Sequence, residues 1–189
     1  IYGTLGFGYS EAIDMPSTQS YADLSVNDSA ATASRDNYGG RVALGALWNT
    51  DKFLSSGLEV GAASYGSYKY SSANSSIEMD YYGIEFLALV QANMKNLKLI
   101  FKAGVDDQRM EMSTSGIVAS GLENNSALSP EFAAGIGYEV TPKLQINATY
   151  YHIVGEDVNF TNSSDANNLP SFNIAFLEAT YSFTSGKAQ

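Results

Sequence analysis

The sequence predicts an all-β fold, an eight-stranded antiparallel up-and-down transmembrane β-barrel. Three observations lead to this prediction. Apolar and polar residues alternate with a period of two along the whole chain, as they do in strands with two different faces. Eight such segments follow one another, and short and long connectors alternate between them. No window approaches the roughly 18 consecutive apolar residues that a membrane-spanning helix needs.

Composition narrows the class of protein. The chain has 189 residues, which fits one domain, and only 16% are charged, against roughly 25% in an average soluble domain. The net charge of −10 argues against a nucleic-acid partner, which needs clustered Lys and Arg. There is no cysteine, so disulfides and thiolate metal ligands are excluded. The chain starts without Met in patterned sequence, which we interpret as a mature protein after removal of a signal peptide.

The first four alternating segments span residues 1–10, 38–48, 57–70 and 79–90. Each has one apolar face, and the opposite face is small or polar, as expected for a strand between two environments. In chain order, the members of the apolar face are Ile1, Leu5, Phe7 and Tyr9; Val42, Leu44, Ala46 and Trp48; Leu58, Val60, Ala62, Tyr68 and Tyr70; and Tyr82, Ile84, Phe86, Ala88 and Val90.

The last four segments span residues 97–106, 131–140, 143–152 and 173–183 and follow the same rule. Their length of about ten residues is enough for a tilted strand to cross a membrane. In chain order, the members of their apolar face are Leu97, Leu99, Phe101, Ala103 and Val105; Phe132, Ala134, Ile136, Tyr138 and Val140; Leu144, Ile146, Ala148 and Tyr150; and Ala175, Leu177, Ala179, Tyr181 and Phe183.

Connector lengths form a second pattern. Short turns are expected at 49–52, 92–96 and 141–143, and the long polar connectors are 11–36, 71–76, 113–129 and 155–170. In an antiparallel barrel with an even number of strands, the short turns and both termini then lie at one end, and the four long loops lie at the other. We predict a barrel over residues 1–183 and a C-terminal tail over 184–189.

The polar face predicts a membrane barrel with a packed polar lumen. A water-facing surface would hold several Lys and Glu in each strand, whereas glycine, serine, alanine and single charges fill this face. Eight strands leave an interior just wide enough for side chains to fill. Because unpaired buried charges are costly, these inward charges are expected to pair. The predicted lumen charge network consists of Arg41, Glu59, Glu85, Lys102, Glu139 and Glu178.

Aromatic residues on the apolar face gather near the ends of the segments. This distribution is typical of the aromatic girdles that membrane barrels place at the two interfaces. The predicted girdle residues are Trp48, Tyr68, Tyr70, Tyr138 and Tyr181. The long connectors hold nine acidic residues and one basic residue, Arg35.

The final segment, FNIAFLEATYSF, alternates apolar residues and ends on Tyr181 and Phe183. In this respect the chain resembles the small eight-stranded outer-membrane barrels of Gram-negative bacteria, the group of the OmpA transmembrane domain, OmpX, Ail and the opacity-type proteins. The resemblance covers residues 1–183. It implies a location in the bacterial cell outer membrane, contact with its lipid and lipopolysaccharide, and an insertion signal that ends on Tyr181 and Phe183.

Candidate chemical sites are weak, and we predict no catalytic, cofactor-binding or metal site. Some barrels of the family that this chain resembles are lipid A deacylases, which carry a serine two residues after a histidine. Here Val154 lies two residues after His152, so the pair is absent. A lipid A palmitoyltransferase of this resemblance would combine His152 with Asp28-Ser29. A protease would combine His152 with Asp106-Asp107. No calcium-loop pattern occurs among the acidic residues of the loops. Those residues are Asp23, Asp28, Asp36, Glu156, Asp157 and Asp165.

The function expected from the sequence is that of a monomeric structural or surface-interaction protein of the adhesin kind. Loops on a rigid scaffold usually carry specificity, so a host surface ligand is expected on the four long connectors. A narrow, porin-like channel gated by the Arg41/Lys102–glutamate network is the alternative. A lipid-active enzyme and a soluble lipocalin-like carrier are further alternatives.

Overall fold

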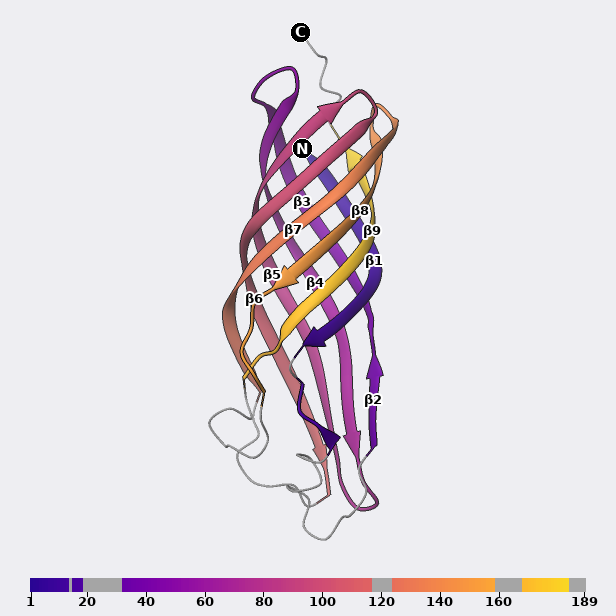
Figure 1. Ribbon diagram of the computed structural model, residues 1–189, viewed down its shortest axis with the longest axis vertical. Coiled ribbons are helices and arrows are strands. Elements are labelled where there is room, and N and C mark those ends of the chain that lie inside the picture. The colour runs from indigo at the N-terminus through magenta and orange to yellow at the C-terminus, as the bar shows by residue number, and fades with distance from the viewer. Residues whose placement is uncertain (14, 19–31, 117–123, 159–167, 184–189) are drawn as a thin grey trace.

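The computed structural model describes residues 1–13, 15–18, 32–116, 124–158 and 168–183. Its strands form one antiparallel sheet that closes when β4 pairs with β5 (Figure 1). The strands are β1 (Tyr2–Ile13), β2 (Thr32–Asp36), β3 (Tyr38–Asn49), β4 (Leu54–Ser71), β5 (Ser76–Met94), β6 (Leu97–Ser115), β7 (Asn125–Thr141), β8 (Leu144–Ile153) and β9 (Ser171–Ser182). No helix among the described residues is long and apolar enough to cross a membrane.

The barrel wall has eight strand positions, which confirms the predicted fold class. β2 and β3 both pair with β4 and follow each other along it, so together they occupy one strand position, with an interruption at Asn37. β1 pairs with β3 on one side and β9 on the other, and the remaining neighbours are consecutive in the chain. The short turns after β3, β5 and β7 lie at one end of the barrel (Figure 1).

Side chains alternate between the two faces of the sheet as the period of two predicts. Leu5, Phe7, Leu58 and Leu177 point outward and are each at least 60% exposed. Arg41, Glu59 and Glu178 point inward and are buried. An exterior of exposed apolar side chains around a charged interior is the arrangement of a membrane barrel, because lipid and not water surrounds it.

Two of the predicted girdle residues are on the wrong face. Trp48, Tyr138 and Tyr181 are outward and exposed as expected, but Tyr68 and Tyr70 are only 1% exposed and lie inside the barrel. The cause is a bulge in β4, where the pairing with β5 shifts between Ser64 and Gly66. One extra residue reverses the alternation, so odd-numbered residues of β4 point inward before the bulge and even-numbered residues point inward after it.

The strands also run further than the sequence indicated at the long-loop end. β4 reaches Ser71 and β5 begins at Ser76, so the predicted long loop 71–76 is a tight turn. β6 continues to Ser115, and β2 occupies the end of the predicted loop 11–36. Figure 1 shows β4, β5 and β6 extending beyond the ends of β1 and β8, with β2 beside β4. Because transmembrane β-barrels of this kind place their longer loops on the extracellular side, we call β2 together with residues 65–71 of β4, 76–82 of β5 and 107–115 of β6 the extracellular sheet.

Candidate functional site

Arg41 lies at the centre of a buried ion-pair network inside the barrel. It projects from β3 and binds carboxylates from three other strands, Glu59 of β4, Glu85 of β5 and Glu178 of β9. Its Nη2 is 2.6 Å from Glu59 Oε1, its Nε is 2.7 Å from Glu85 Oε2, and its Nη1 is 3.0 Å from Glu178 Oε1. One guanidinium fork therefore ties four strands together through charge-assisted hydrogen bonds.

Small residues make room for this network. Gly61 lies on β4 beside Glu85 of β5 in the sheet register. A Cβ at Gly61 would lie 2.5 Å from Glu85 Oε2, so any side chain there would displace the carboxylate that reaches Arg41. The inward glycines of the sequence pattern thus have a specific role here, which is to clear the path between charges on neighbouring strands.

Lys102 of β6 is the second cation of the network. Its Nζ donates to Glu59 Oε1 at 2.7 Å and to the Tyr151 hydroxyl at 2.8 Å, and that hydroxyl donates to Glu178 Oε1 at 2.9 Å. Tyr2 donates to the second oxygen of Glu59 at 2.8 Å. Both oxygens of Glu59 and of Glu178 are satisfied in this way, since Thr149 donates to Glu178 Oε2 at 2.8 Å. The arrangement is a satisfied core of charges.

Two further carboxylates lie in the interior without such partners. Asp106 of β6 is opposite Glu85 in the register, and Glu131 lies on β7; both are 0% exposed. None of their four carboxylate oxygens accepts a hydrogen bond from a described residue. The Tyr65 hydroxyl lies beside Asp106 without completing a bond of good geometry. Among the described residues, five buried carboxyls therefore share two network cations, Arg41 and Lys102, because the third buried cation, Lys98, pairs with Glu139.

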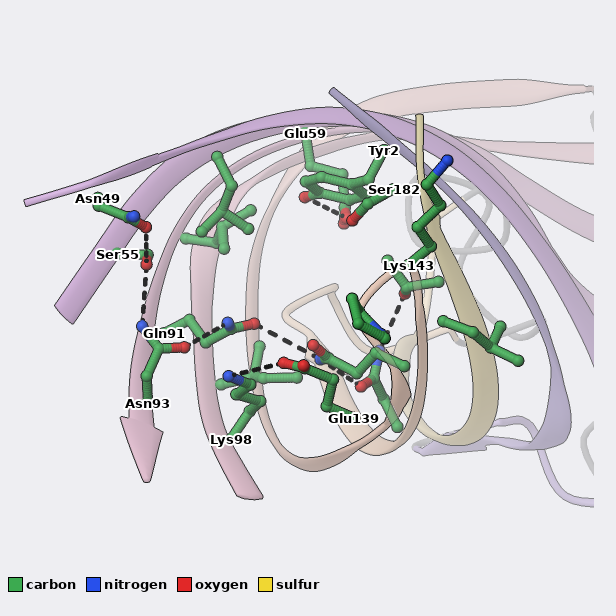
Figure 2. Close-up of a pocket in the computed structure, with 18 of the residues that line it drawn as sticks. Tyr2, Asn49, Ser55, Glu59, Gln91, Asn93, Lys98, Glu139, Lys143 and Ser182 are labelled. Atoms are coloured by element: carbon green, nitrogen blue, oxygen red, sulfur yellow. Dashed lines mark hydrogen bonds and ion pairs between the residues drawn. The ribbon is translucent and has the colours of Figure 1, made fainter. Parts of the chain in front are cut away.

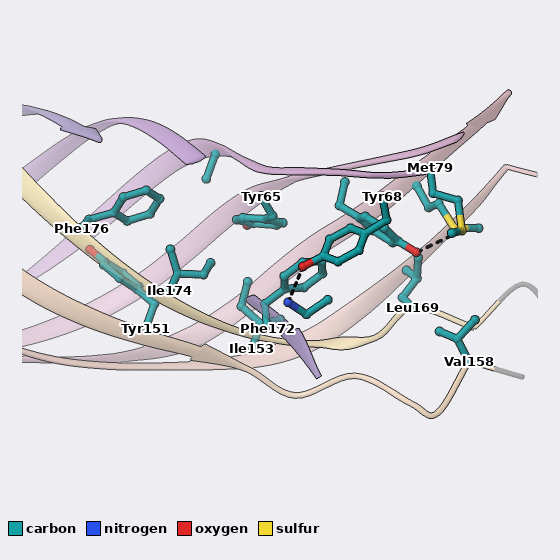
Figure 3. Close-up of a cluster of buried hydrophobic side chains, with 14 of the residues drawn as sticks. Tyr65, Tyr68, Met79, Tyr151, Ile153, Val158, Leu169, Phe172, Ile174 and Phe176 are labelled. Carbon is teal, nitrogen blue, oxygen red and sulfur yellow. Dashed lines mark hydrogen bonds between the residues drawn. The ribbon is translucent and has the colours of Figure 1, made fainter. Parts of the chain in front are cut away.

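On the extracellular side of the network, aromatic and aliphatic side chains fill the interior. Tyr65, Tyr81, Tyr151 and Phe172 are almost fully buried there, and the rings of Tyr65 and Tyr81 each lie 5.2 Å from the ring of Phe172 (Figure 3). This half of the lumen is mainly apolar, with Gln108 and Ser129 among its buried polar residues, whereas the sequence predicted a polar lumen throughout. Residues of β8 and β9 contribute much of this cluster, and Tyr68 and Tyr70, which the bulge turned inward, add to it together with residues of the extended ends of β5 and β6.

On the short-turn side of the network, the lumen opens into a vestibule of about 920 Å³ (Figure 2). Its inner wall includes Glu59 and Lys102. Hydrogen-bonded amides line its sides, with Gln145 donating to Asn147 at 2.6 Å and Gln91 donating to Asn93 at 2.8 Å. The charge network thus separates a water-accessible half of the barrel from a mainly apolar half.

The structure brings five of the six predicted network residues together and places Glu139 apart. Glu139 forms an ion pair of 3.1 Å with Lys98 in the wall of the vestibule. Sequence reasoning missed Lys98, Asp106 and Glu131 as interior residues. All three are in phase with the inward residues of their strands, so the alternation itself contained the signal.

The other candidate residues form no chemical site in the described part of the chain. His152 Nδ1 lies 2.8 Å from Asn173 Oδ1. Asp106 points inward while Asp107 points to the opposite face and pairs with Arg109, so the Asp106-Asp107 pair does not act together. Asp36, Glu156 and Asp157 are exposed, and no described group of three or more His, Asp or Glu is placed to hold a metal. Asp23, Asp28, Ser29 and Asp165 lie outside the described residues.

Tyr181 and Phe183 lie where the last strand ends. Both are exposed on the outer face, and their rings make an edge-to-face contact with 5.7 Å between centroids. The Phe183 N–H donates to the Ile1 carbonyl at 3.0 Å, so the end of the chain is tied to its beginning. Tail residues 184–189 lie outside the described residues.

A closed antiparallel barrel with an apolar exterior and a charged interior defines a bacterial outer-membrane barrel protein. Residues 1–183 match the family described as the outer membrane protein beta-barrel domain, and the chain belongs to this family. The protein is therefore located in the bacterial outer membrane. Comparison with curated protein sequences gives no match.

Solved structures of small outer-membrane barrels share the fold. Ail, the attachment invasion locus protein of Yersinia pestis, in complex with the heparin analogue sucrose octasulfate, aligns with a TM-score of 0.51 and 15% identity over 95% of this chain and 97% of Ail. Neisserial surface protein A aligns with a TM-score of 0.51 and 12% identity over 96% of both chains. At these identities the likeness establishes the fold.

Proposed function

We propose that this protein is a monomeric, non-enzymatic surface-interaction protein whose extracellular face binds a positively charged partner. The observation that carries the proposal is an acidic excess at the long-loop end of a barrel with a filled interior, where Asp36, Asp80, Glu111, Glu156 and Asp157 are exposed among the described residues. The long connectors hold nine acidic residues and one basic residue. A surface potential of one sign steers a partner of the opposite sign and favours its binding.

The extracellular sheet supports this charge assignment because its basic residues are already engaged. Lys69 pairs with Glu78 at 3.2 Å, and Arg109 pairs with Asp107. The Arg35 guanidinium lies over the ring of Tyr68, 5.8 Å from its centroid. These three cations therefore interact with groups of the protein itself. The charge that remains available to a partner is the acidic excess.

Asp80 shows how closely the acidic side chains are placed. It lies directly opposite Glu111 in the register of β5 and β6, and Glu78 is two residues away on β5. Partial burial and the charges of Glu78 and Glu111 raise the pKa of Asp80 above its usual value. A cationic partner would relieve this repulsion, since like charges directly opposite each other on a sheet are destabilising.

The charge also separates this protein from a relative of the same fold. Ail was solved with a heparin analogue, which is a polyanion. An acidic surface repels sulfate groups, so a sulfated glycan is not the partner that this surface favours. A basic polypeptide segment on another molecule fits it better.

The experiment is a binding measurement on the refolded protein in lipid nanodiscs. A lysine-rich peptide should bind, heparin should not, and binding should weaken steeply with salt, because exposed charges are screened within about 10 Å at 0.1 M salt. A variant that lacks residues 19–31 and 117–123 should bind more weakly while keeping its barrel. These deletions spare Pro16 and Asn124, which make hydrogen bonds to Tyr70 and Met112.

A matched charge variant sharpens this test. Asp80→Asn together with Glu111→Gln should weaken peptide binding, and Lys69→Met should leave it equal or stronger. Binding of heparin in preference to the peptide, or peptide binding that ignores both salt and these substitutions, would contradict the proposal.

A narrow channel is the second candidate, and the vestibule is the observation that favours it. Half of the lumen is already open to water and ends at Glu59 and Lys102. Conduction would then require the Arg41 network and the aromatic residues beyond it to rearrange.

A further inference from the structure

Four of the five methionines of the chain gather at the extracellular end of the barrel interior. Met79 and Met110 are buried in the core, and Met15 and Met112 pack against it. The fifth, Met94, ends β5 at the opposite end of the barrel and is 46% exposed.

The sheet register places three of these side chains on one patch of the inner wall. Met79 of β5 is directly opposite Met112 of β6, and Met110 lies two residues along β6 on the same face. Opposite residues on one face of an antiparallel pair have Cβ atoms about 5 Å apart, and diagonal neighbours about 7–8 Å. Long, flexible thioether side chains can meet across these distances.

The fourth methionine is brought to the patch by the segment after β1. The Tyr70 hydroxyl donates to the Pro16 carbonyl at 2.7 Å, which holds the neighbouring Met15 against the core. Met15 Sδ lies 3.9 Å from the Tyr81 hydroxyl oxygen, and Met79 Sδ lies 3.5 Å from the same atom. Two sulfurs from distant parts of the chain therefore converge on one hydroxyl group, near Met79 in Figure 3.

The chemistry of this cluster selects a particular ligand. Thioethers are neutral and soft, and they prefer soft monovalent cations to Zn²⁺, Mg²⁺ or Ca²⁺. No described group of three or more His, Asp or Glu is placed to hold a metal, so no harder donor set competes for it. We propose that Met15, Met79, Met110 and Met112 form a binding site for a soft monovalent cation, Cu(I) or Ag(I).

Two members of the cluster keep some exposure to solvent, where an ion can reach them. Met15 and Met112 are only partly buried, whereas Met79 and Met110 are 0% and 1% exposed. The outer pair receives the ion and the inner pair completes its coordination, which rotation about the three side-chain bonds of methionine permits. No change in the strands is needed.

The test is a titration of the refolded protein, labelled with ¹³C at the methionine methyl groups, with Ag(I), which needs no reductant. The methyl signals of Met15, Met79, Met110 and Met112 should shift together and saturate at one Ag(I) per chain, while Met94 stays unchanged. Zn²⁺ at the same concentration should shift none of them. Cu(I) supplied with a reductant should reproduce the Ag(I) pattern.

Isosteric variants separate binding from packing. Met79→Leu should lower the Ag(I) affinity about tenfold or more, while Met94→Leu leaves it unchanged. Met112→Leu serves as a second variant at a less buried position. The proposal is overturned if all five methyl signals shift alike, if none shifts, or if a folded Met79→Leu or Met112→Leu protein binds Ag(I) as tightly as the wild type.

Discussion

The Tyr68 hydroxyl accepts a hydrogen bond of 2.7 Å from the backbone N–H of Ala12 across the barrel interior. Tyr70, two residues later, donates to the Pro16 carbonyl. Both tyrosines face inward only because the bulge at Gly66 reverses the alternation of β4. A local backbone irregularity thus anchors the segment that follows β1 and fills the extracellular half of the lumen.

Gly66 should be sensitive to any side chain. Its φ is +91°, and a Cβ there would collide with the Asp36 carbonyl oxygen. We expect Gly66→Ala to lower the free energy of unfolding by about 1–3 kcal/mol, measured by urea titration in detergent micelles. Gly40→Ala is the control, because its Cβ would meet only the Gly6 carbonyl oxygen at 3.9 Å. Equal stability of the two variants would mean that the bulge is dispensable.

Removing the central cation should be costly. Arg41→Met leaves Glu85 without its hydrogen-bonded cation and takes a partner from Glu59 and Glu178. The expected loss is about 3–5 kcal/mol of unfolding free energy, because breaking a buried ion pair strands its carboxylates. Lys69→Met, which breaks an exposed pair, should change stability little. A tolerated Arg41→Met would show that the network is not structural.

The two carboxyls without partners should behave in the opposite way. Asp106→Asn and Glu131→Gln remove potential buried charge and break no hydrogen bond that a described residue makes to these carboxylates. Each should leave the unfolding free energy unchanged or raise it by about 1 kcal/mol or more, whereas Glu178→Gln should lower it. Urea titrations of the three isosteric variants give the comparison. Destabilisation by Asp106→Asn as large as that by Glu178→Gln would refute this assignment.

Protonation of Asp80 in acid should stabilise the extracellular sheet. Because the pKa of Asp80 is raised in the folded protein, the fold binds this proton more tightly than the unfolded chain does. The stability that protonated Asp80 contributes is therefore fully present below the ordinary aspartate pKa. It is lost as the pH rises through the raised pKa of the folded protein. Asp80→Asn should raise the unfolding midpoint at pH 7, and the difference should vanish near about pH 3. A difference that persists in acid would exclude charge repulsion as its cause.

The sequence predicted the eight barrel strands because, in seven of the eight segments, the same alternate residues face outward along the whole segment. It missed the inward turn of Tyr68 and Tyr70 because a bulge shifts the phase, and the pattern reads as continuous if Gly66 is treated as an ordinary strand residue. It placed Ser71–Ser76 in a long loop because serine and asparagine suit loops and exposed strand ends equally.

The interior was predictable in part for a similar reason. Arg41, Glu59, Glu85, Lys102 and Glu178 share the inward phase, so their convergence followed from the barrel itself. The pairing of Glu139 with Lys98 did not, because barrel stagger decides which inward charges share a level. The contacts of Met15 and Pro16 lie outside any strand pattern and needed the structure.

A closed lumen leaves the extracellular surface as the part of the barrel that performs the function. Single-channel recording of the refolded protein in planar bilayers shows whether the lumen conducts, with folding verified by heat-dependent gel mobility. We expect no openings from the wild type, nor from variants with Glu59 or Lys102 neutralised that remain folded. Reproducible openings whose conductance changes with these substitutions would show that the lumen is a channel and would place the function there.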